Sequence, residues 1–240
     1  MWKNILLLLF LFVTLGVSAQ NEKIINDPKA SPRQVESFHA IFVEDGIDVY
    51  LTQGNEEAIA VSANKEAYRD NIVTKVMNGV LKIYYKKENN ISITWGNRKL
   101  RAYISVKNID ALTASGGSDI IVKGTVLFNK LTMNLSSGSD FAGEVKCSEL
   151  FIAISGGSDI TISGTATNLK VHASGGSDFN GYDLQADYAI IEVSGGSDAQ
   201  VFTTKELFAE ATGGSDIDYK GNPVIKHNSS SGGGSITSRN

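Results

Sequence analysis

Six aspartates recur along the second half of the chain, each closing a Ser-Gly-Gly-Ser-Asp motif or a close variant. Such carboxylates could bind Ca²⁺, which takes oxygen ligands, or could supply the acid and base of a polysaccharide-active enzyme. Consecutive members are 21, 19, 19, 20 and 18 residues apart, which indicates that one repeated structural unit presents all of them. The six are Asp119, Asp140, Asp159, Asp178, Asp198 and Asp216.

The segments between these aspartates predict β-strands. Apolar and polar residues alternate on both sides of each motif, as in Leu131 to Leu135 and Ile160 to Ile162, and this period of two is typical of strands with one buried face. One unit of about nineteen residues cannot bury its apolar face alone, so the units must stack. We therefore predict an all-β fold, a right-handed parallel β-helix (solenoid) in which each unit forms one coil.

Each coil is expected to contain two short strands and two bends. The Gly-Gly pair suits a sharp corner because glycine adopts positive φ without a steric penalty. The second bend is expected near Gly124, Gly143, Gly164 or Gly181. An antiparallel sandwich is the competing arrangement, because alternation does not fix strand direction. The parallel coil is favoured because hairpins would give two unlike turns in every repeat.

Four segments are expected along the chain. Residues 1–19 have the layout of a secretory signal peptide, with Lys3, an apolar stretch, and small residues ending at Ala19. Residues 20–36 form a polar lead-in, 37–111 an N-terminal β region that caps the solenoid, and 112–240 the repeat coils. The leader's apolar run is shorter than the roughly 20 residues of a membrane-spanning helix. We expect an exported protein without a transmembrane segment after leader removal, in the periplasm, on the outer surface or outside the cell.

The N-terminal β region lacks the clean repeat but has recognisable signals. Asn78-Gly79 predicts a hairpin turn, and a short helix is expected over 64–71, capped by Asn64. The segment from Glu44 to Val49 is a weaker copy of the corner and places Asp48 in register with the later aspartates. Strands are expected over 38–43, 47–52, 58–62, 73–76, 80–85 and 100–106.

Composition excludes some classes of function. Removing the leader takes away Lys3, so the mature chain carries a net charge near −5. This acidic balance argues against a nucleic-acid partner, which usually meets a basic face. Cys147 is the only cysteine, so no disulfide within the chain can form.

Gly46-Ile47-Asp48, the run from Asn78 to Ile83 and the serial Ser-Gly-Gly-Ser-Asp units carry a resemblance. Over about Phe38 to Ile236, the chain resembles the "putative autotransporter adhesin head GIN domain" family of Bacteroidetes. Asp48 stands where the family motif has Asn. The resemblance implies an exported β-helical domain, provisionally assigned to adhesion, with no established enzymatic activity.

Stacked coils would place the six aspartates in a row, with neighbours roughly 4.8 Å apart. In the favoured interpretation each carboxylate accepts hydrogen bonds from Ser and Gly N–H groups of its own corner. The alternative is a ladder of Ca²⁺ sites between coils, and no other cofactor is expected. A polysaccharide lyase or hydrolase is a further alternative, but acid–base pairs need unlike environments and these carboxylates sit in near-identical repeats.

These observations predict a non-catalytic, adhesin-like or structural domain of the cell envelope, whose partner is a surface glycan or protein. Aromatic residues around Trp95 and along the coils, with basic residues from Lys82 to Arg101, could meet a glycan or could simply pack on neighbouring strands. The last unit, with a degenerate motif at Ser231 to Ser235, could leave an open coil that a second copy covers. The alternatives are a polysaccharide-active enzyme and a calcium-stabilised scaffold.

Overall fold

The computed structural model describes residues 26–86 and 98–239. The predicted signal peptide, 1–19, lies outside the described residues, as do Lys87 and Trp95.

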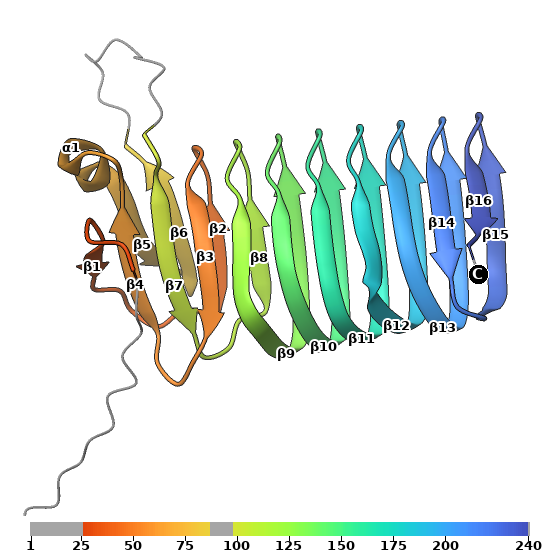
Figure 1. Ribbon diagram of the computed structural model, residues 1–240, viewed down its shortest axis with the longest axis horizontal. Coiled ribbons are helices and arrows are strands. Elements are labelled where there is room, and N and C mark those ends of the chain that lie inside the picture. The colour runs from red at the N-terminus through yellow and green to blue at the C-terminus, as the bar shows by residue number, and fades with distance from the viewer. Residues whose placement is uncertain (1–25, 87–97, 240) are drawn as a thin grey trace, which may run out of the picture.

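All strands in the described ranges join one 16-stranded sheet, wound into a flattened solenoid with two broad faces (Figure 1). Five long strands form the repeat, and each runs parallel to the next. Phe141 pairs with Ile160, one coil of nineteen residues further on. The predicted parallel solenoid is therefore confirmed, and the antiparallel sandwich is wrong for this half. The long strands are β9 (Ile120–Ser136), β10 (Phe141–Ser155), β11 (Ile160–Ser174), β12 (Phe179–Ser194) and β13 (Asp198–Thr212).

The prediction of two short strands per coil was wrong. Each long strand crosses one face, curves around an edge and returns across the other face (Figure 1). Pairing between β10 and β11 continues from Phe141 to Ser155 through this curve. The reason is that parallel neighbours bend alike, so their hydrogen bonds persist around the edge. Gly143 and Gly164, where the second bend was expected, lie within these continuous strands.

The Ser-Gly-Gly-Ser-Asp segments form the opposite edge of the solenoid, where Figure 1 shows a row of tight corners. Gly116 and Gly117 have φ of 64° and 73°. Two successive positive φ angles turn the chain sharply, and glycine adopts this conformation at the lowest cost. Ser137 and Asp45 hold equivalent positions with φ of 59° and 68°, so two corners use a residue with a side chain there.

The core lies between the two faces and is built from columns of inward side chains. One column begins at Ile120 and continues through Phe141, Ile160 and Phe179 to Ala199, each at most 2% exposed. The facing column consists of Leu131, Leu150, Leu169, Ala189 and Leu207, each at most 3% exposed. Burial of these columns drives the stacking, because no coil can remove its own apolar side chains from water.

The N-terminal region closes one end of the solenoid and is wound out of sequence order. β3 (Asp48–Gln53) lies between β7 (Arg101–Val106) and β9, while β2 (Ala40–Val43) lies between β6 (Val80–Tyr85) and β8 (Ala111–Ala114). The cap itself is antiparallel, with β4 (Ala58–Ser62) on β7 and β1 (Ser31–Arg33) on β4. On the other face β5 (Ile72–Met77) pairs antiparallel with β6.

Several local predictions for this region are confirmed. Asn78 and Gly79 form the turn between β5 and β6, with φ of 52° and 75°. Val49 pairs with Ile120, which puts Asp48 in register with Asp119. The predicted cap at Asn64 was wrong: α1 (Glu66–Asp70) begins after Lys65, which makes no side-chain capping bond. β1 lies inside the predicted polar lead-in.

At the other end, the last coil is built from shorter strands. β14 (Asp216–Lys220) and β16 (Ser235–Ser238) continue one face, and β15 (Val224–Ser231) continues the other. Within the described ranges, no helix combines the length and apolar character needed to cross a bilayer.

Candidate functional site

The corner edge contains a ladder of buried serines that the sequence analysis did not identify. The fourth residue of each Ser-Gly-Gly-Ser-Asp corner is fully buried. From Ser139 onward its Oγ accepts a hydrogen bond from the backbone N–H of the equivalent serine in the preceding coil, while Ser118 Oγ accepts from the N–H groups of Gly46 and Ile47. Ser118 N–H donates to Ser139 Oγ at 2.9 Å, and Ser139 N–H donates to Ser158 Oγ at 3.0 Å. The ladder comprises Ser118, Ser139, Ser158, Ser177, Ser197 and Ser215, each 0% exposed.

The six predicted aspartates do form a row beside this ladder, but their hydrogen bonds differ from the prediction. Asp159 N–H donates to Asp140 Oδ1 at 2.9 Å, and Asp178 N–H donates to Asp159 Oδ1 at 3.0 Å. The donor therefore belongs to the next coil and not to the aspartate's own corner. This follows from parallel stacking, which places the same backbone N–H above every carboxylate. The contacts recur at Asp119, Asp198 and Asp216.

These contacts offset the electrostatic cost of the row. Unit charges at the spacing of stacked strands repel by about 1 kcal/mol in water, and hydrogen bonds to ionised acceptors are worth about 1.5–3 kcal/mol each. At the far end, Ser235 donates its N–H and its hydroxyl to Asp216 Oδ1 at 3.1 and 2.7 Å. Within the described ranges, no three acidic, histidine or cysteine side chains converge into a metal-binding group. A Ca²⁺ ladder thus stays a prediction.

The N-terminal end of the row is its most desolvated part. Burial raises the pKa of Asp48, and the adjacent Asp119 carboxylate adds to the shift, against the lowering effect of Arg101. Burial also raises the pKa of Asp119, and the Asp140 carboxylate acts in the same direction, while the Asp140 N–H opposes it. Two neighbouring carboxylates that are both half-buried repel each other and lose hydration, an electrostatic cost that the more exposed members of the row avoid.

The groups that could act in catalysis are dispersed. His39 lies 3.0 Å from Asp110 at an exposed site, and His227 stacks on Phe208 with ring centroids 4.3 Å apart. His172 lies on β11, 3.9 Å from Glu192. Burial raises the pKa of the Cys147 thiol to about 11, so it is protonated at neutral pH and a poor nucleophile. The corner carboxylates from Asp140 onward recur in one type of hydrogen-bonded environment, whereas an acid–base pair needs two unlike environments.

The N-terminal aromatic residues are engaged with their neighbours. Tyr50 and Tyr103 stack with centroids 5.2 Å apart, and the Tyr103 hydroxyl donates to Asp27 at 2.8 Å. The guanidinium of Arg98 lies 4.6 Å from the ring centroid of Tyr85. For these residues the structure supports packing of the cap over the alternative of a glycan surface.

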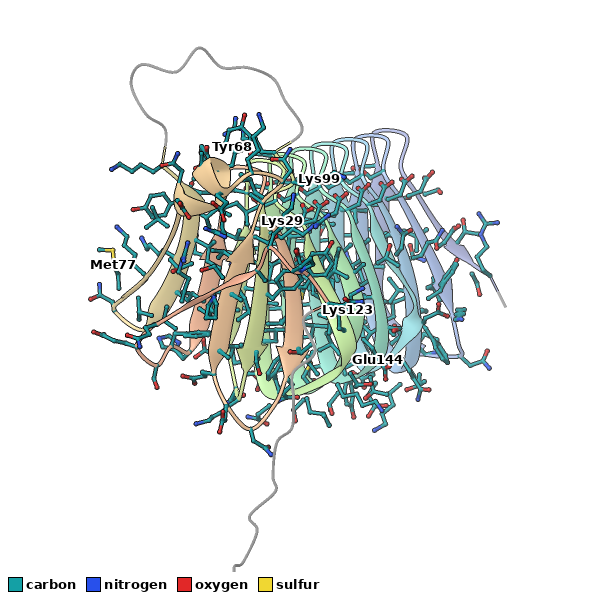
Figure 2. All side chains as sticks on the ribbon, turned by 60° about the vertical axis from the view of Figure 1, so that its left-hand side comes forward. Lys29, Tyr68, Met77, Lys99, Lys123 and Glu144 are labelled. Carbon is teal, nitrogen blue, oxygen red and sulfur yellow. The ribbon has the colours of Figure 1, made fainter. Side chains whose placement is uncertain are left out.

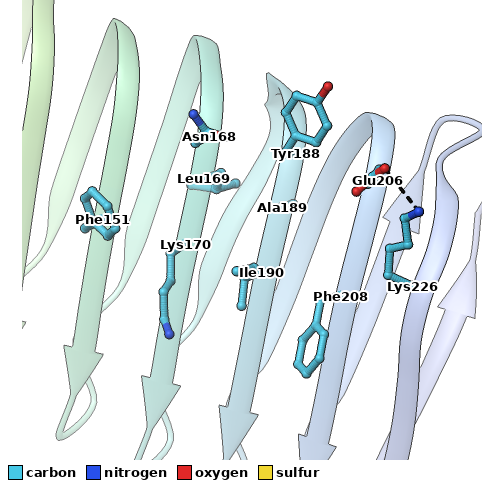
Figure 3. Close-up of a pocket in the computed structure, with 10 residues that line it drawn as sticks. All are labelled: Phe151, Asn168, Leu169, Lys170, Tyr188, Ala189, Ile190, Glu206, Phe208 and Lys226. Carbon is cyan, nitrogen blue, oxygen red and sulfur yellow. Dashed lines mark ion pairs between the residues drawn. The ribbon is translucent and has the colours of Figure 1, made fainter.

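A shallow groove of about 300 Å³ crosses β10 to β15 on one face (Figure 3). Phe151, Ile190 and Phe208 occupy equivalent outward positions on their coils. Charged groups border this apolar surface: Lys130 Nζ lies 5.1 Å from the Phe151 ring centroid, and Lys226 pairs with Glu206 at 3.2 Å. These pairs join side chains of neighbouring coils, which adds to the cohesion of the stack.

Figure 2 shows that side chains project from both faces of the solenoid, while the corners form a separate edge. The fold and these surfaces together define a class: a capped parallel β-solenoid in which a hydrogen-bonded frame holds rows of outward side chains. The family follows from comparison with known proteins. The chain belongs to the family described as "Putative auto-transporter adhesin, head GIN domain", whose model matches residues 37–223. The predicted family is thereby confirmed.

Solved structures with the same fold include three from Bacteroidetes. A "putative adhesin" from Bacteroides fragilis has a TM-score of 0.80 and 19% identity, over 88% of this chain and 96% of that one. A "putative adhesin" from Parabacteroides merdae has a TM-score of 0.68 and 17% identity, over 89% of this chain and 98% of that one. A "putative lipid binding protein" from Parabacteroides distasonis has a TM-score of 0.64 and 21% identity, over 90% of this chain and 98% of that one. At these identities the likeness establishes the fold alone. No curated protein matches the chain.

Proposed function

We propose that this chain is an exported, non-catalytic binding domain of adhesin-like character, whose ligand is a glycan or protein at a surface. The observation that carries the proposal is a difference between the inward and outward positions of each coil. Inward columns and corner ladders are nearly uniform from coil to coil, whereas outward positions vary. Along one row of neighbours, the residues are Ala142, Thr161, Asn180 and Gln200.

Such a frame suits binding to extended ligands. Parallel pairing holds successive outward side chains about 4.8 Å apart, and their backbone is fixed on both sides by neighbouring coils. Contacts made by several coils add together without a large ordering cost, because the frame is rigid before the ligand arrives. Membership of an adhesin-like family supports this role.

The test uses the mature chain beginning at Gln20. Its binding to immobilised glycans and purified surface proteins is measured by biolayer interferometry, and the same glycans are incubated with it and assayed for new reducing ends. We expect saturable binding without turnover. Turnover that is lost on Asp159→Asn would establish the polysaccharide-active alternative and refute the proposal. Secretion with an N-terminus at Gln20 is the expected result for export, and retention of an uncleaved leader would contradict it.

The end of the solenoid favours a second candidate, self-association. Within the described ranges β15 has a strand neighbour only on the β13 side, and Val224 and Ile225 are 59% and 40% exposed. An unpaired, partly apolar edge is a template for pairing with another chain. Light scattering should then show a concentration-dependent dimer that Ile225→Lys dissociates. A monomer at all concentrations would exclude this candidate.

A further inference from the structure

A second and larger groove crosses the face opposite to the groove of Figure 3. We call it the trough: it has a volume of about 750 Å³ and is lined from Val122 on β9 to Lys220 on β14. Five coil steps of about 4.8 Å separate these strands, so the trough is roughly 24 Å long. It lies on the first halves of the long strands, whereas the groove of Figure 3 lies on their second halves and on β15.

Two irregular coils shape the trough. In β9, Val122 to Gly124 face the single residue Gly143 of β10, so β9 bulges outward. In β12, Tyr182 to Leu184 are unpaired on the side of β13, and Figure 1 shows the resulting kink in β12. Gly143 lies opposite the first bulge, and an added Cβ there would lie 2.4 Å from Val122 Cβ. The pairing between β10 and β11 shows no register shift. β-Bulges commonly re-aim side chains at binding sites.

A row of neutral polar side chains runs along the trough. Thr161, Asn180 and Gln200 stand at matching positions on three consecutive coils, and all three are exposed. Within the described part of the chain, their side chains make no hydrogen bond or ion pair. They therefore differ from Glu206 and Lys226 in Figure 3, which form an ion pair. Together they offer two amides and a hydroxyl at a spacing of one coil.

Charges around the row indicate which ligands fit. The carboxylates of Glu144 and Asp183 line the trough. Glu144 pairs with Lys146 at 3.6 Å, so Asp183 is the lining carboxylate that repels anions. The one lysine among the lining residues, Lys220, lies 5.3 Å from the ring centroid of Tyr182 and 5.0 Å from that of Phe202. Burial, reinforced by Asp218, raises the pKa of Tyr182, so its phenol is neutral at ordinary pH. The lining combines uncharged hydrogen-bonding groups with the aromatic ring of Tyr182, and it carries two carboxylates against one lysine, which favours uncharged ligands over polyanions.

We infer that the trough binds one extended strand of an uncharged polysaccharide, with sugar hydroxyls hydrogen-bonded to Thr161, Asn180 and Gln200. This inference rests on the proposed binding function and assigns its site and ligand class. Amide side chains donate and accept at once, which matches hydroxyl groups that do the same. The coil spacing is close to the length of one sugar ring in an extended chain, so successive coils meet successive sugars.

The inference is tested by affinity electrophoresis in native gels containing xylan, mannan, hydroxyethyl cellulose or, as the anionic probe, polygalacturonate. The test variant is Asn180→Ala/Gln200→Ala, and the matched control is Asn134→Ala/Gln185→Ala, which removes the same two residue types at exposed positions outside the trough. At least one neutral polymer should retard the native chain. The test variant should bind that polymer roughly ten-fold or more weakly, because several hydrogen bonds are lost, and the control should bind it unchanged.

A second variant separates the two proposals. Ile190→Ser/Phe208→Ser alters the groove of Figure 3 and leaves the trough intact. If binding to a neutral polymer is lost in this variant but kept in Asn180→Ala/Gln200→Ala, the trough assignment fails while the binding function stands. Retardation by polygalacturonate alone would overturn the ligand class. If no polymer retards the chain, the inference is refuted. Binding to a purified surface protein by the same chain would then uphold the proposed function by itself.

Discussion

Removal of one hydroxyl from the serine ladder tests how the corners are held together. Ser158 is 0% exposed, and its Oγ accepts the N–H of Ser139 at 3.0 Å. Ser158→Ala leaves that N–H buried without a partner, which costs about 1–3 kcal/mol. The N–H of residue 158 still donates to Ser177 Oγ, so only one rung is lost. The backbone can keep its conformation, because a single oxygen atom is removed.

The assay is equilibrium unfolding in guanidinium chloride at pH 7, compared with Ser148→Ala. Ser148 is exposed in the curved part of β10, and its change should alter the free energy of unfolding by less than about 0.5 kcal/mol. Hydrogen exchange adds a local readout: the Ser139 amide should exchange roughly ten-fold or more faster in Ser158→Ala. Equal stabilities for the two variants, together with an unchanged Ser139 amide, would refute the ladder as a source of stability.

Three further predictions address the corners and the aspartate row. Ser137→Gly should raise the free energy of unfolding by about 1 kcal/mol, because a side chain at φ of 59° carries a penalty that glycine avoids; a lower denaturation midpoint would contradict this. The raised pKa of Asp48 means that its contribution to stability is complete below the unfolded-state pKa of about 3.9 and is lost as pH rises through the folded-state pKa. Asp48→Asn should therefore raise the free energy of unfolding at pH 7 but not at pH 3. The exposed control Glu36→Gln should raise it at neither pH, and a gain for Asp48→Asn that is the same at both pH values would refute the assignment. EDTA should leave the melting temperature unchanged, because backbone N–H groups already neutralise part of the charge of the carboxylate row; a clear drop restored by Ca²⁺ would instead establish the calcium-stabilised scaffold.

The regular half of the fold was predictable from sequence because the same short pattern of strand and corner residues recurs in every coil. Alternation gave the inward columns, and the recurring Gly-Gly pair gave the corners. The serine ladder was within reach as well, since the fourth motif residue is serine in all six units, even where Ser137 replaces glycine. The direction of the aspartate contacts was not predictable, because it depends on which coil lies above each carboxylate.

The irregular parts escaped prediction for a different reason. The placement of β3 between β7 and β9 depends on contacts between distant segments and leaves no periodic signal. The trough arises from small differences in coil length, such as the extra residues around Tyr182. Aligning the units on their aspartates would have shown Thr161, Asn180 and Gln200 at one position, although their exposure and lack of partners required the structure.

The most direct test of the stacked, in-register solenoid is a pair of distances between spin labels, measured in a Cys147→Ser background. Asn134, Glu210 and Ser229 belong to one outward row, four and five coils apart. Labels at Asn134→Cys with Glu210→Cys should lie about 19 Å apart, and those at Asn134→Cys with Ser229→Cys about 24 Å apart, allowing for the label arms. Distances that grow by one strand spacing per coil are the predicted result, and distances that fail to increase from the first pair to the second would contradict the fold.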